Sequence, residues 1–451
     1  MATIDALPDS LLVFIFSRLS QHDRRRFGAR VCRRWQQLCN SAPQLLRCTS
    51  ARVGGHVPGA AHLRSFCRWL MQHAAPHVQR LSLQITPHAQ TWDIREQLCA
   101  AAAAGLTACG LAGSLTALRL EGPFCEPPVW TGSMHALRGL TLIADGPHHD
   151  SWHCVWPQDL AALQELSLSG SLFSLLDADL PTGLTRLHLD LSQLQEEEPE
   201  DEPSLPEDLW KLTRLHTLCV AGAQRGIESL GDLRHLRRLS LCNCSAWPDG
   251  LSQLTCLEAL VLVNSEAALM DAQDDAAAFV AALPHLPLLT HLALDDPAQP
   301  GPPAELAALS SLRSLAWLHP AVLPADSPWL GRLTRLALAA ESAAALAPAL
   351  AAAAPRLESL GLSCGVHTEP DLASLLRCVP GMPACRRLLL AGSEQVFGRS
   401  AQVMLDAQRA APHLRVLCSE HPGALWREFV CDFAPDLSRE GFLAAAECER
   451  H

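Results

Sequence analysis

The feature that most constrains this chain is a leucine pattern that recurs along most of its length. Residues 236–244, LRRLSLCNC, have the form L-x-x-L-x-L-x-x-C, and LTALRL, LQELSL, LTRLHL, LEALVL and LESLGL repeat its core. About fourteen copies are present, and successive copies begin 21 to 37 residues apart. A period of this length predicts one small structural unit per copy. Such units stack, because a single unit cannot bury its own apolar face.

Each L-x-L core is expected to form a short β-strand. Successive side chains of a strand point to opposite faces, so the leucines face the core and the x residues form the other face, called here the variable face. Stretches such as LPEDLWKLTRL and WPDGLSQLTCL are expected to supply helical or 3-10 return segments. The sequence therefore predicts an α/β solenoid built on a parallel sheet.

This pattern resembles the leucine-rich repeat family from about residue 77 to residue 420. The resemblance implies a curved sheet whose variable face is concave. The family places Asn or Cys three residues after the last strand leucine, and here only Cys244 fits. We therefore expect an irregular arc.

Residues 1–50 differ from the repeats and read as a small helical domain. In LPDSLLVFIFSRLS, residues 7–20, the side chains Leu11, Leu12, Ile15, Phe16 and Leu19 form a helical stripe. HDRRRFGARVCRRWQQLC, residues 22–39, places further apolar residues at steps of three and four, with Gly28 as a break. Three short helices with this much apolar surface imply a partner, because so small a domain buries little surface by itself.

The head resembles an F-box over roughly residues 4–48, on the strength of LPDSLLVFIFSRL, the turn at Asp23 and VCRRW. The resemblance implies docking onto the Skp-family adaptor of a cullin-RING ubiquitin ligase. It implies that the surface is built or contacted by Leu7, Pro8, Leu11, Leu12, Ile15, Leu19, Val31, Cys32 and Trp35. The expected organisation is an F-box at 1–50, a linker and capping helix at 51–76, a solenoid at 77–430 and a C-terminal cap or tail at 431–451.

An F-box followed by leucine-rich repeats implies a non-catalytic, substrate-recruiting subunit of an SCF-type ubiquitin ligase, whose cargo is degraded by the proteasome. The alternative is a stand-alone repeat scaffold in which the head only caps the solenoid. The variable face is expected to change from polar, as at Arg119 and Glu121, to apolar from Leu257 onward. The expected cargo-binding residues are Arg186, His188, Asp190, Arg238, Val261 and Val263.

Charge and targeting signals narrow the class of partner. Residues 1–50 carry eight Arg and three Asp, a balance of +5, whereas the other 401 residues carry 27 basic and 44 acidic groups. An acidic body disfavours nucleic acid.

The apolar run near the N-terminus lacks a preceding positive charge, and no stretch has the roughly 18 apolar residues that a membrane span requires. We expect a cytoplasmic or nuclear protein whose 18 cysteines are mostly reduced.

Two short motifs suggest chemistry, and neither predicts an enzyme. GLSCG, residues 361–365, matches a hydrolase nucleophile elbow, but Ser363 occupies an ordinary post-strand position of the repeat. PHHDSWHC, residues 147–154, gathers His148, His149, His153 and Cys154, a weak zinc candidate with no standard spacing. No catalytic residue and no cofactor is expected. Lys211 is the single lysine of the sequence.

Overall fold

A computed structural model of the chain describes residues 7–19, 24, 31–54, 59–86, 101–102, 104–122, 134–144, 160–170, 180–192, 204–244, 248, 250–263, 273–295, 302–317, 327–339, 350, 356–364, 376–377, 382–392 and 394–419. The chain divides into two compact units. Unit 1 comprises residues 1–186 and unit 2 comprises residues 187–451. Each unit is described by itself.

The described strands form a fifteen-stranded sheet in which spatial order follows chain order, β1 to β15. The strands are β1 (Cys48–Gly54), β2 (Arg80–Thr86), β3 (Ala117–Gly122), β4 (Gly139–Ala144), β5 (Glu165–Ser169), β6 (Arg186–Asp190), β7 (Thr217–Ala221), β8 (Arg238–Cys242), β9 (Ala259–Val263), β10 (His291–Asp295), β11 (Ser314–Trp317), β12 (Arg335–Ala339), β13 (Ser359–Cys364), β14 (Arg387–Gly392) and β15 (Arg415–Ser419). Strand pairing is parallel, as in β3 with β4 and in β8 with β9. The predicted α/β fold, helices followed by a parallel repeat sheet, is confirmed.

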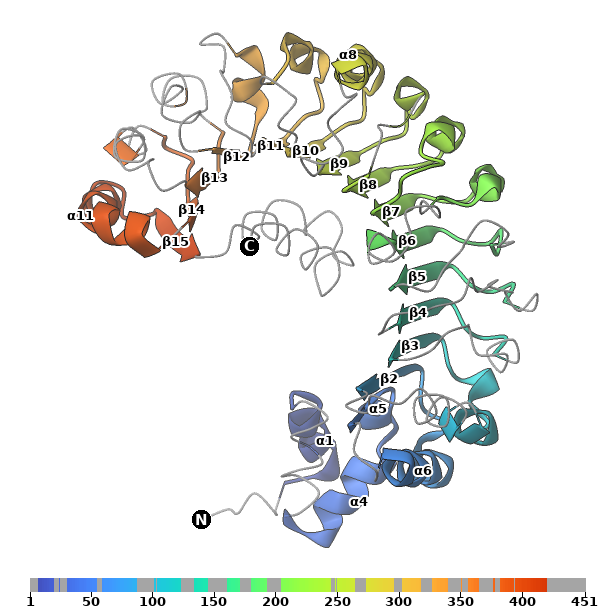
Figure 1. Cartoon of the computed structure of the whole chain (residues 1–451). Helices are drawn as coiled ribbons and strands as arrows, with labels where there is room; N and C mark the ends of the chain where they lie inside the picture. The colour runs from blue at the N-terminus through green and yellow to red at the C-terminus, as the bar shows by residue number, and fades with distance from the viewer. Residues whose placement is uncertain are drawn as a thin grey trace. The chain divides into compact units, whose positions relative to one another are not determined.

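Helices occupy the start of the chain and the returns between strands (Figure 1). The described α-helices are α1 (Asp9–Ser17), α4 (Arg33–Ser41), α5 (Pro43–Leu46), α6 (Gly59–Trp69), α8 (Gln273–Ala282) and α11 (Glu394–Ala410). Short 3-10 helices form other returns, including Glu207–Lys211 and Leu251–Gln253. A π-helical turn, Leu70–Ala74, continues α6. Most of the third helix expected in the head, near residues 22–30, lies outside the described residues.

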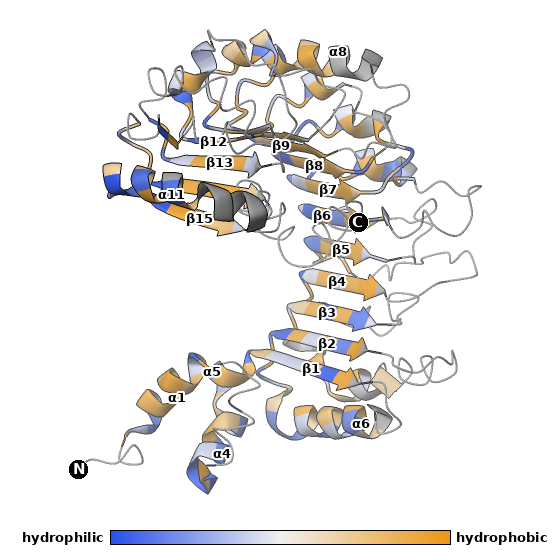
Figure 2. Ribbon diagram, turned by 60° about the vertical axis from the view of Figure 1, so that its left-hand side comes forward, coloured by the Kyte–Doolittle hydropathy of each residue, from blue (hydrophilic) through white to orange (hydrophobic). Residues whose placement is uncertain are grey.

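The leucine ladder holds each unit together. Leu118 of β3 aligns with Leu140 of β4, and Leu239 of β8 aligns with Leu260 of β9. All four side chains are at most 2% exposed. Figure 2 shows these apolar positions alternating with more polar ones along many strands. The alternation follows from the two-residue period of a strand, so the L-x-L spacing fixes which side chains form the core.

The sheet begins earlier than the recognised repeats. Fourteen L-x-L copies correspond to β2 through β15, whereas β1 pairs with β2 in parallel from Cys48↔Arg80 to Gly54↔Thr86. Its sequence, CTSARVG, contains no leucine, so the repeat pattern does not reveal it. Arg47, just ahead of this strand, accepts two backbone hydrogen bonds from Gln79 and Arg80. The head is therefore joined to the sheet by a strand and not by a linker alone.

The turn after strand β8 shows which contacts hold the backbone where one repeat strand ends. Asn243 has a left-handed backbone with φ of 51°, and its N–H donates to the Val263 carbonyl at 2.6 Å. The Cys244 sulfur lies 3.5 Å from the Cys242 carbonyl oxygen. Burial raises the pKa of the Cys244 thiol to about 11, so the thiol is protonated at neutral pH. Cys244 thus acts as a buried turn residue.

Two further observations, one on Ser363 and one on the helices, bear on expectations from the sequence. Ser363 lies within β13, where it is aligned with Ala339 of β12 and Ala391 of β14. It is part of a regular strand and not of a strand-to-helix turn. Among the described helices, none combines the length and apolarity needed to cross a membrane.

Candidate interaction surfaces

The buried face of α1 builds the core of the head. Leu12 and Phe16, one helical turn apart, are 0% and 1% exposed and pack with Leu45 of α5. The Phe16 and Trp35 rings meet edge to face, with centroids 5.0 Å apart. These contacts join α1 to α4 and α5. The head therefore has a small core of its own.

The opposite face of α1 is apolar and exposed. Leu11, Phe14 and Ile15 are 48%, 57% and 39% exposed, and they lie at i, i+3 and i+4 on one side of the helix. Leu19, just past the end of the helix, is 40% exposed, and Val31 is 56% exposed. We call these five residues the head patch. A helix with apolar side chains on both faces needs a second cover, which the described residues of the head do not supply.

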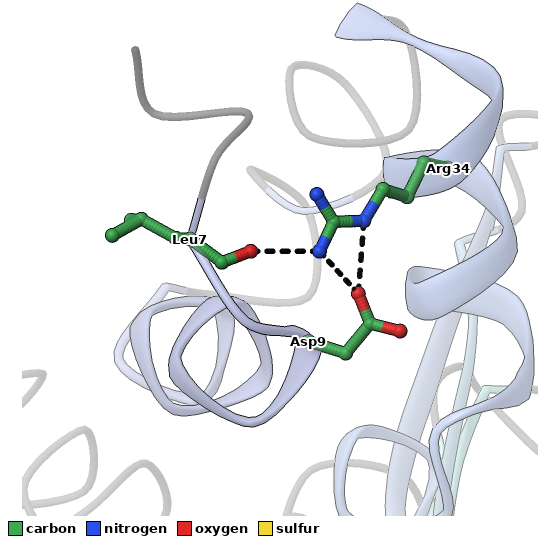
Figure 3. Close-up of polar contacts among 3 residues, drawn as sticks. All are labelled: Leu7, Asp9 and Arg34. Atoms are coloured by element: carbon green, nitrogen blue, oxygen red, sulfur yellow. Dashed lines mark hydrogen bonds and ion pairs between the residues drawn. The ribbon is translucent and has the colours of Figure 1, made fainter. Parts of the chain in front are cut away.

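A polar contact fixes the start of α1 against α4 (Figure 3). Arg34 Nη2 lies 2.5 Å from Asp9 Oδ1 and donates to the Leu7 carbonyl at 2.7 Å, while Arg34 Nε donates to the same Asp9 oxygen at 2.9 Å. Asp9 stands in the first turn of the helix, where a negative charge is favourable. Arg34 also ties down the extended residues that precede the helix.

The predicted adaptor-binding residues divide into two groups. Leu12 is buried, and Leu7 and Trp35 are half-buried against the same core. Pro8, Leu11, Ile15, Leu19 and Val31 are exposed, and Cys32 is half-buried just before α4. The first group builds the domain, and the second is available for contact. Sequence reasoning left out Phe14, although it is the most exposed member of the head patch.

Two arginines of the basic head serve internal contacts. Arg34 binds Asp9 and Leu7, as described above, and Arg24 donates to the Leu45 carbonyl at 3.1 Å. The adjacent Cys39 is partly buried, and this burial raises the pKa of its thiol. The sequence analysis recognised LPDSLL and VCRRW as separate motifs, and it did not predict the contact that Asp9 and Arg34 make between them across 25 residues.

The variable face of unit 1 is polar, as predicted. Arg52 of β1 donates to Gln84 of β2, which in turn donates to Glu121 of β3. Arg119 lies 3.2 Å from the same glutamate. Further along the unit, Arg186 pairs with Glu165 at 2.8 Å, and both side chains are 53% exposed. The predicted cargo residue Arg186 is therefore accessible, but its positive charge is already paired with Glu165.

The variable face of unit 2 carries the other predicted cargo residues. His188 is half-buried, and Asp190 is 4% exposed and accepts a 2.6 Å hydrogen bond from the Ser192 hydroxyl. Arg238 is exposed at the start of β8. Val261 and Val263 of β9 are 4% and 7% exposed. The variable face becomes apolar here, as expected, and its two valines are buried.

The weak zinc candidate, His148, His149, His153 and Cys154, lies outside the described residues. Within the part of the chain that the structure describes, no three His, Cys, Asp or Glu side chains are placed to hold a metal ion.

A comparison with protein-family models identifies the head. Residues 4–50 match the family model described as F-box-like. A comparison with curated protein sequences gives no match.

The solved structures that the chain resembles are distant from it in sequence. They include the Toll–Spatzle complex of Drosophila, with 14% identity and a TM-score of 0.45 over 83% of this chain and 54% of that one. The functional domain of InlJ from Listeria monocytogenes has 12% identity and a TM-score of 0.36 over 79% of this chain and 72% of that one. The LRR ectodomain of the receptor kinase GASSHO1/SCHENGEN3 from Arabidopsis thaliana has 14% identity and a TM-score of 0.33 over 83% and 48%.

The chain carries an F-box-like domain at residues 4–50, followed by a parallel solenoid sheet with a leucine repeat.

The division of α1 into a core face and an exposed face can be tested with two phenylalanines. Phe16→Ala removes a buried ring and is expected to destabilise the head by about 3–5 kcal/mol. Phe14→Ala removes an exposed ring and is expected to change head stability by less than about 0.5 kcal/mol. Hydrogen exchange of the backbone amides of α1 under increasing urea measures the stability of the head in each variant. Equal losses in the two variants would contradict the assignment of faces.

Proposed function

We propose that this protein is the substrate-recognition subunit of an SCF-type ubiquitin ligase. In this proposal the head patch docks onto a Skp-family adaptor, and the variable face of the solenoid binds the protein to be ubiquitinated. The observation that carries the proposal is the head patch, five exposed apolar side chains on a domain that matches the F-box-like model. F-box domains generally bind Skp-type adaptors.

Energetics supports a docking role for this face. Burial of apolar surface contributes about 25 cal/mol per Å², and a Leu, Ile or Phe side chain contributes about 1.5–3 kcal/mol when fully buried. Each side chain of the head patch has a large exposed fraction that a partner could bury. A partner that covers all five gains enough to offset the entropic cost of association.

The stand-alone scaffold, in which the head is only a cap, has one observation in its favour. Helix α4 contacts the π-helical turn Leu70–Ala74 at the start of the repeats. However, this contact involves a different part of the head from the exposed face of α1. Capping therefore accounts for the position of α4 and leaves the head patch without a role.

The ligase chemistry belongs to the partners in this proposal, and the chain itself acts without a catalytic residue. Its task is to hold cargo near the ubiquitin-loaded enzyme. Because those complexes act in the cytoplasm and nucleus, we also propose these compartments as its location.

Charge placed in the head patch should abolish adaptor binding. For Ile15→Asp combined with Leu19→Asp, we expect at least about a hundredfold weaker binding, because a carboxylate would be buried in an apolar interface. Calorimetric titration of the full-length chain with a purified Skp-family adaptor measures the affinity.

The matched control is Leu288→Asp with Leu405→Asp, two leucines of unit 2 that are each 49% exposed. This control should bind like the unchanged chain. Binding that survives the head substitutions, or no binding by the unchanged chain, would refute the proposal.

The single lysine provides a second test. Lys211 ends the 3-10 helix Glu207–Lys211, and its side chain is 44% exposed. Its Nζ lies 2.6 Å from Asp208 Oδ2 and 5.9 Å from the centre of the Trp210 ring. An exposed ion pair of this kind is weak and opens readily, so the amine remains accessible to an acylating enzyme.

If the chain recruits the ligase, self-modification should concentrate on Lys211. We expect Lys211→Arg to reduce self-ubiquitination at least about fivefold, because Arg keeps the charge and its contacts but does not accept ubiquitin. The assay uses the reconstituted ligase and a chain whose N-terminal amine is blocked. Mass spectrometry then locates and quantifies the ubiquitinated sites. Extensive ubiquitin chains on the Lys211→Arg protein would contradict the prediction. The affinity of this variant for the adaptor should be unchanged.

A further inference from the structure

Two buried cysteines of unit 1 meet where the first two return segments of the sheet pack together. Cys67 lies in α6, between β1 and β2, and Cys109 lies in the connection from β2 to β3. The two residues are 3% and 5% exposed, and both thiols are free of a disulfide. They are 42 positions apart in the chain, so the stacking of neighbouring repeats brings them together.

The end of a short helical segment positions Cys109. Residues 104–108 are helical, and the Cys109 N–H donates to the Leu106 carbonyl at 3.2 Å. Gly110 follows with φ of 65°, a left-handed conformation that glycine adopts without strain and that ends the helix. The Cys109 sulfur lies 3.0 Å from the Gly105 carbonyl oxygen, one turn earlier.

The Cys109 thiol contacts the backbone of α6 at the point where that helix changes form. Its sulfur lies 3.3 Å from the Cys67 carbonyl oxygen and accepts a hydrogen bond from the Met71 N–H. In a regular α-helix the N–H of residue 71 would donate to the carbonyl of residue 67. A side chain between these two groups interrupts the helical ladder, and the π-helical turn Leu70–Ala74 begins there. Cys109 thus has a defined place against the backbone of α6.

Close approach of the two return segments brings the Cys67 sulfur to the same place. A side chain at Gly105 would have its Cβ 2.5 Å from Cys67 Sγ, which is closer than real contacts allow. Glycine at position 105 therefore leaves the room that the Cys67 sulfur fills. The Cys67 and Cys109 thiols are hydrogen-bonded to each other. Side chains already in contact need only a small movement to form a disulfide.

The hydrogen bond between the thiols makes the two cysteines chemically unequal. It lowers the pKa of Cys67 and raises the pKa of Cys109, because the Cys109 S–H stabilises a thiolate on Cys67. The thiolate, and not the thiol, is the nucleophile in cysteine oxidation. Cys67 is therefore the attacking sulfur, and Cys109 keeps its proton until the second step.

We propose that Cys67 and Cys109 are a peroxide-sensitive pair that forms a disulfide between α6 and the turn at residue 109. The Cys67 thiolate attacks one oxygen of hydrogen peroxide, the O–O bond breaks, and Cys67 becomes a sulfenic acid. The other oxygen leaves as hydroxide and becomes water with the proton that Cys67 had released.

The second step closes the disulfide. The Cys109 sulfur attacks the Cys67 sulfur, the S–S bond forms, and the S–O bond breaks. The hydroxyl group leaves with the Cys109 proton as a second water. Two thiols are thus oxidised by two electrons in all, and one peroxide is reduced to two waters.

The disulfide acts on a joint that supports the head. Helix α4 of the head contacts the π-helical turn, and α6 contacts β1. A covalent bond from Cys67 to Cys109 ties α6 to the next repeat, so local opening of this part of unit 1 becomes rarer. A thiol reductant reverses the change. The inference concerns this joint alone and holds whether or not the head binds an adaptor.

Peptide mapping after oxidation tests the pair directly. The reduced full-length chain is treated with hydrogen peroxide, the remaining thiols are blocked with N-ethylmaleimide, and disulfide-linked peptides are quantified by mass spectrometry. We expect the Cys67–Cys109 peptide to accumulate at least about tenfold faster than any linked peptide that contains the exposed Cys48 or Cys418. Linkage of Cys67 and Cys109 only to other cysteines, or no linkage while Cys48 is oxidised, would overturn the proposal.

Two glycines provide a matched test in which both thiols stay. Gly105→Ala places a methyl group against the Cys67 sulfur and displaces it, so disulfide formation should slow at least about fivefold. Gly113→Ala, in the 3-10 helix Leu111–Gly113, meets no atom within 4 Å and should leave the rate unchanged. Equal rates in the two variants would contradict the assigned geometry.

Hydrogen exchange of the chain with its natural sequence measures the consequence of oxidation. We expect the backbone amides of α6 and of Leu70–Ala74 to exchange at least about tenfold more slowly after peroxide treatment, while those of β9 and β10 in unit 2 do not change. In the Cys109→Ser chain, which keeps a small polar group at this position, peroxide should not slow these amides. The same slowing in Cys109→Ser, or unchanged exchange in α6 after complete Cys67–Cys109 linkage, would reject the proposed effect on the joint.

Discussion

The structure depends on one constraint, the stacking of leucines from parallel strands one repeat apart. Each strand places two leucine-like side chains into the core, and the next strand continues the row, as with Leu118 and Leu140. Since the two-residue period sends every other side chain to the opposite face, the same ladder creates the variable face. The variable residues are then free to differ between repeats without loss of the core. This freedom explains a polar surface in unit 1 and an apolar one in unit 2.

In the head, the described residues cover only one face of helix α1. Leu12 and Phe16 use one face of α1 to hold the domain together, and Arg34 fixes the start of the helix through Asp9. Leu11, Phe14 and Ile15 remain exposed on the other face. A stable domain that retains an apolar face is suited to reversible assembly with a partner. The head and the variable face thus provide separate surfaces on one chain.

The sequence predicted the repeats well because each strand carries its own leucine pair. It missed β1, whose residues are held by backbone pairing to β2 and whose side chains carry no repeat signal. In the head it identified the apolar residues but not which of them are buried, because Leu11 and Leu12 are chemically alike and only packing against α5 separates them. It predicted an apolar variable face but not that Val261 and Val263 are only 4% and 7% exposed. Domain limits and cargo residues remain predictions.

Hydrogen exchange of the intact chain, with and without a purified Skp-family adaptor, tests the central claim most directly. The account predicts that adaptor slows exchange at the end of α1 and around Leu19 and Val31, while exchange in the strands of unit 2 is unchanged. That pattern would place the interface on the head patch without any substitution. Slower exchange confined to the sheet, or none in residues 9–19 at saturating adaptor, would contradict it.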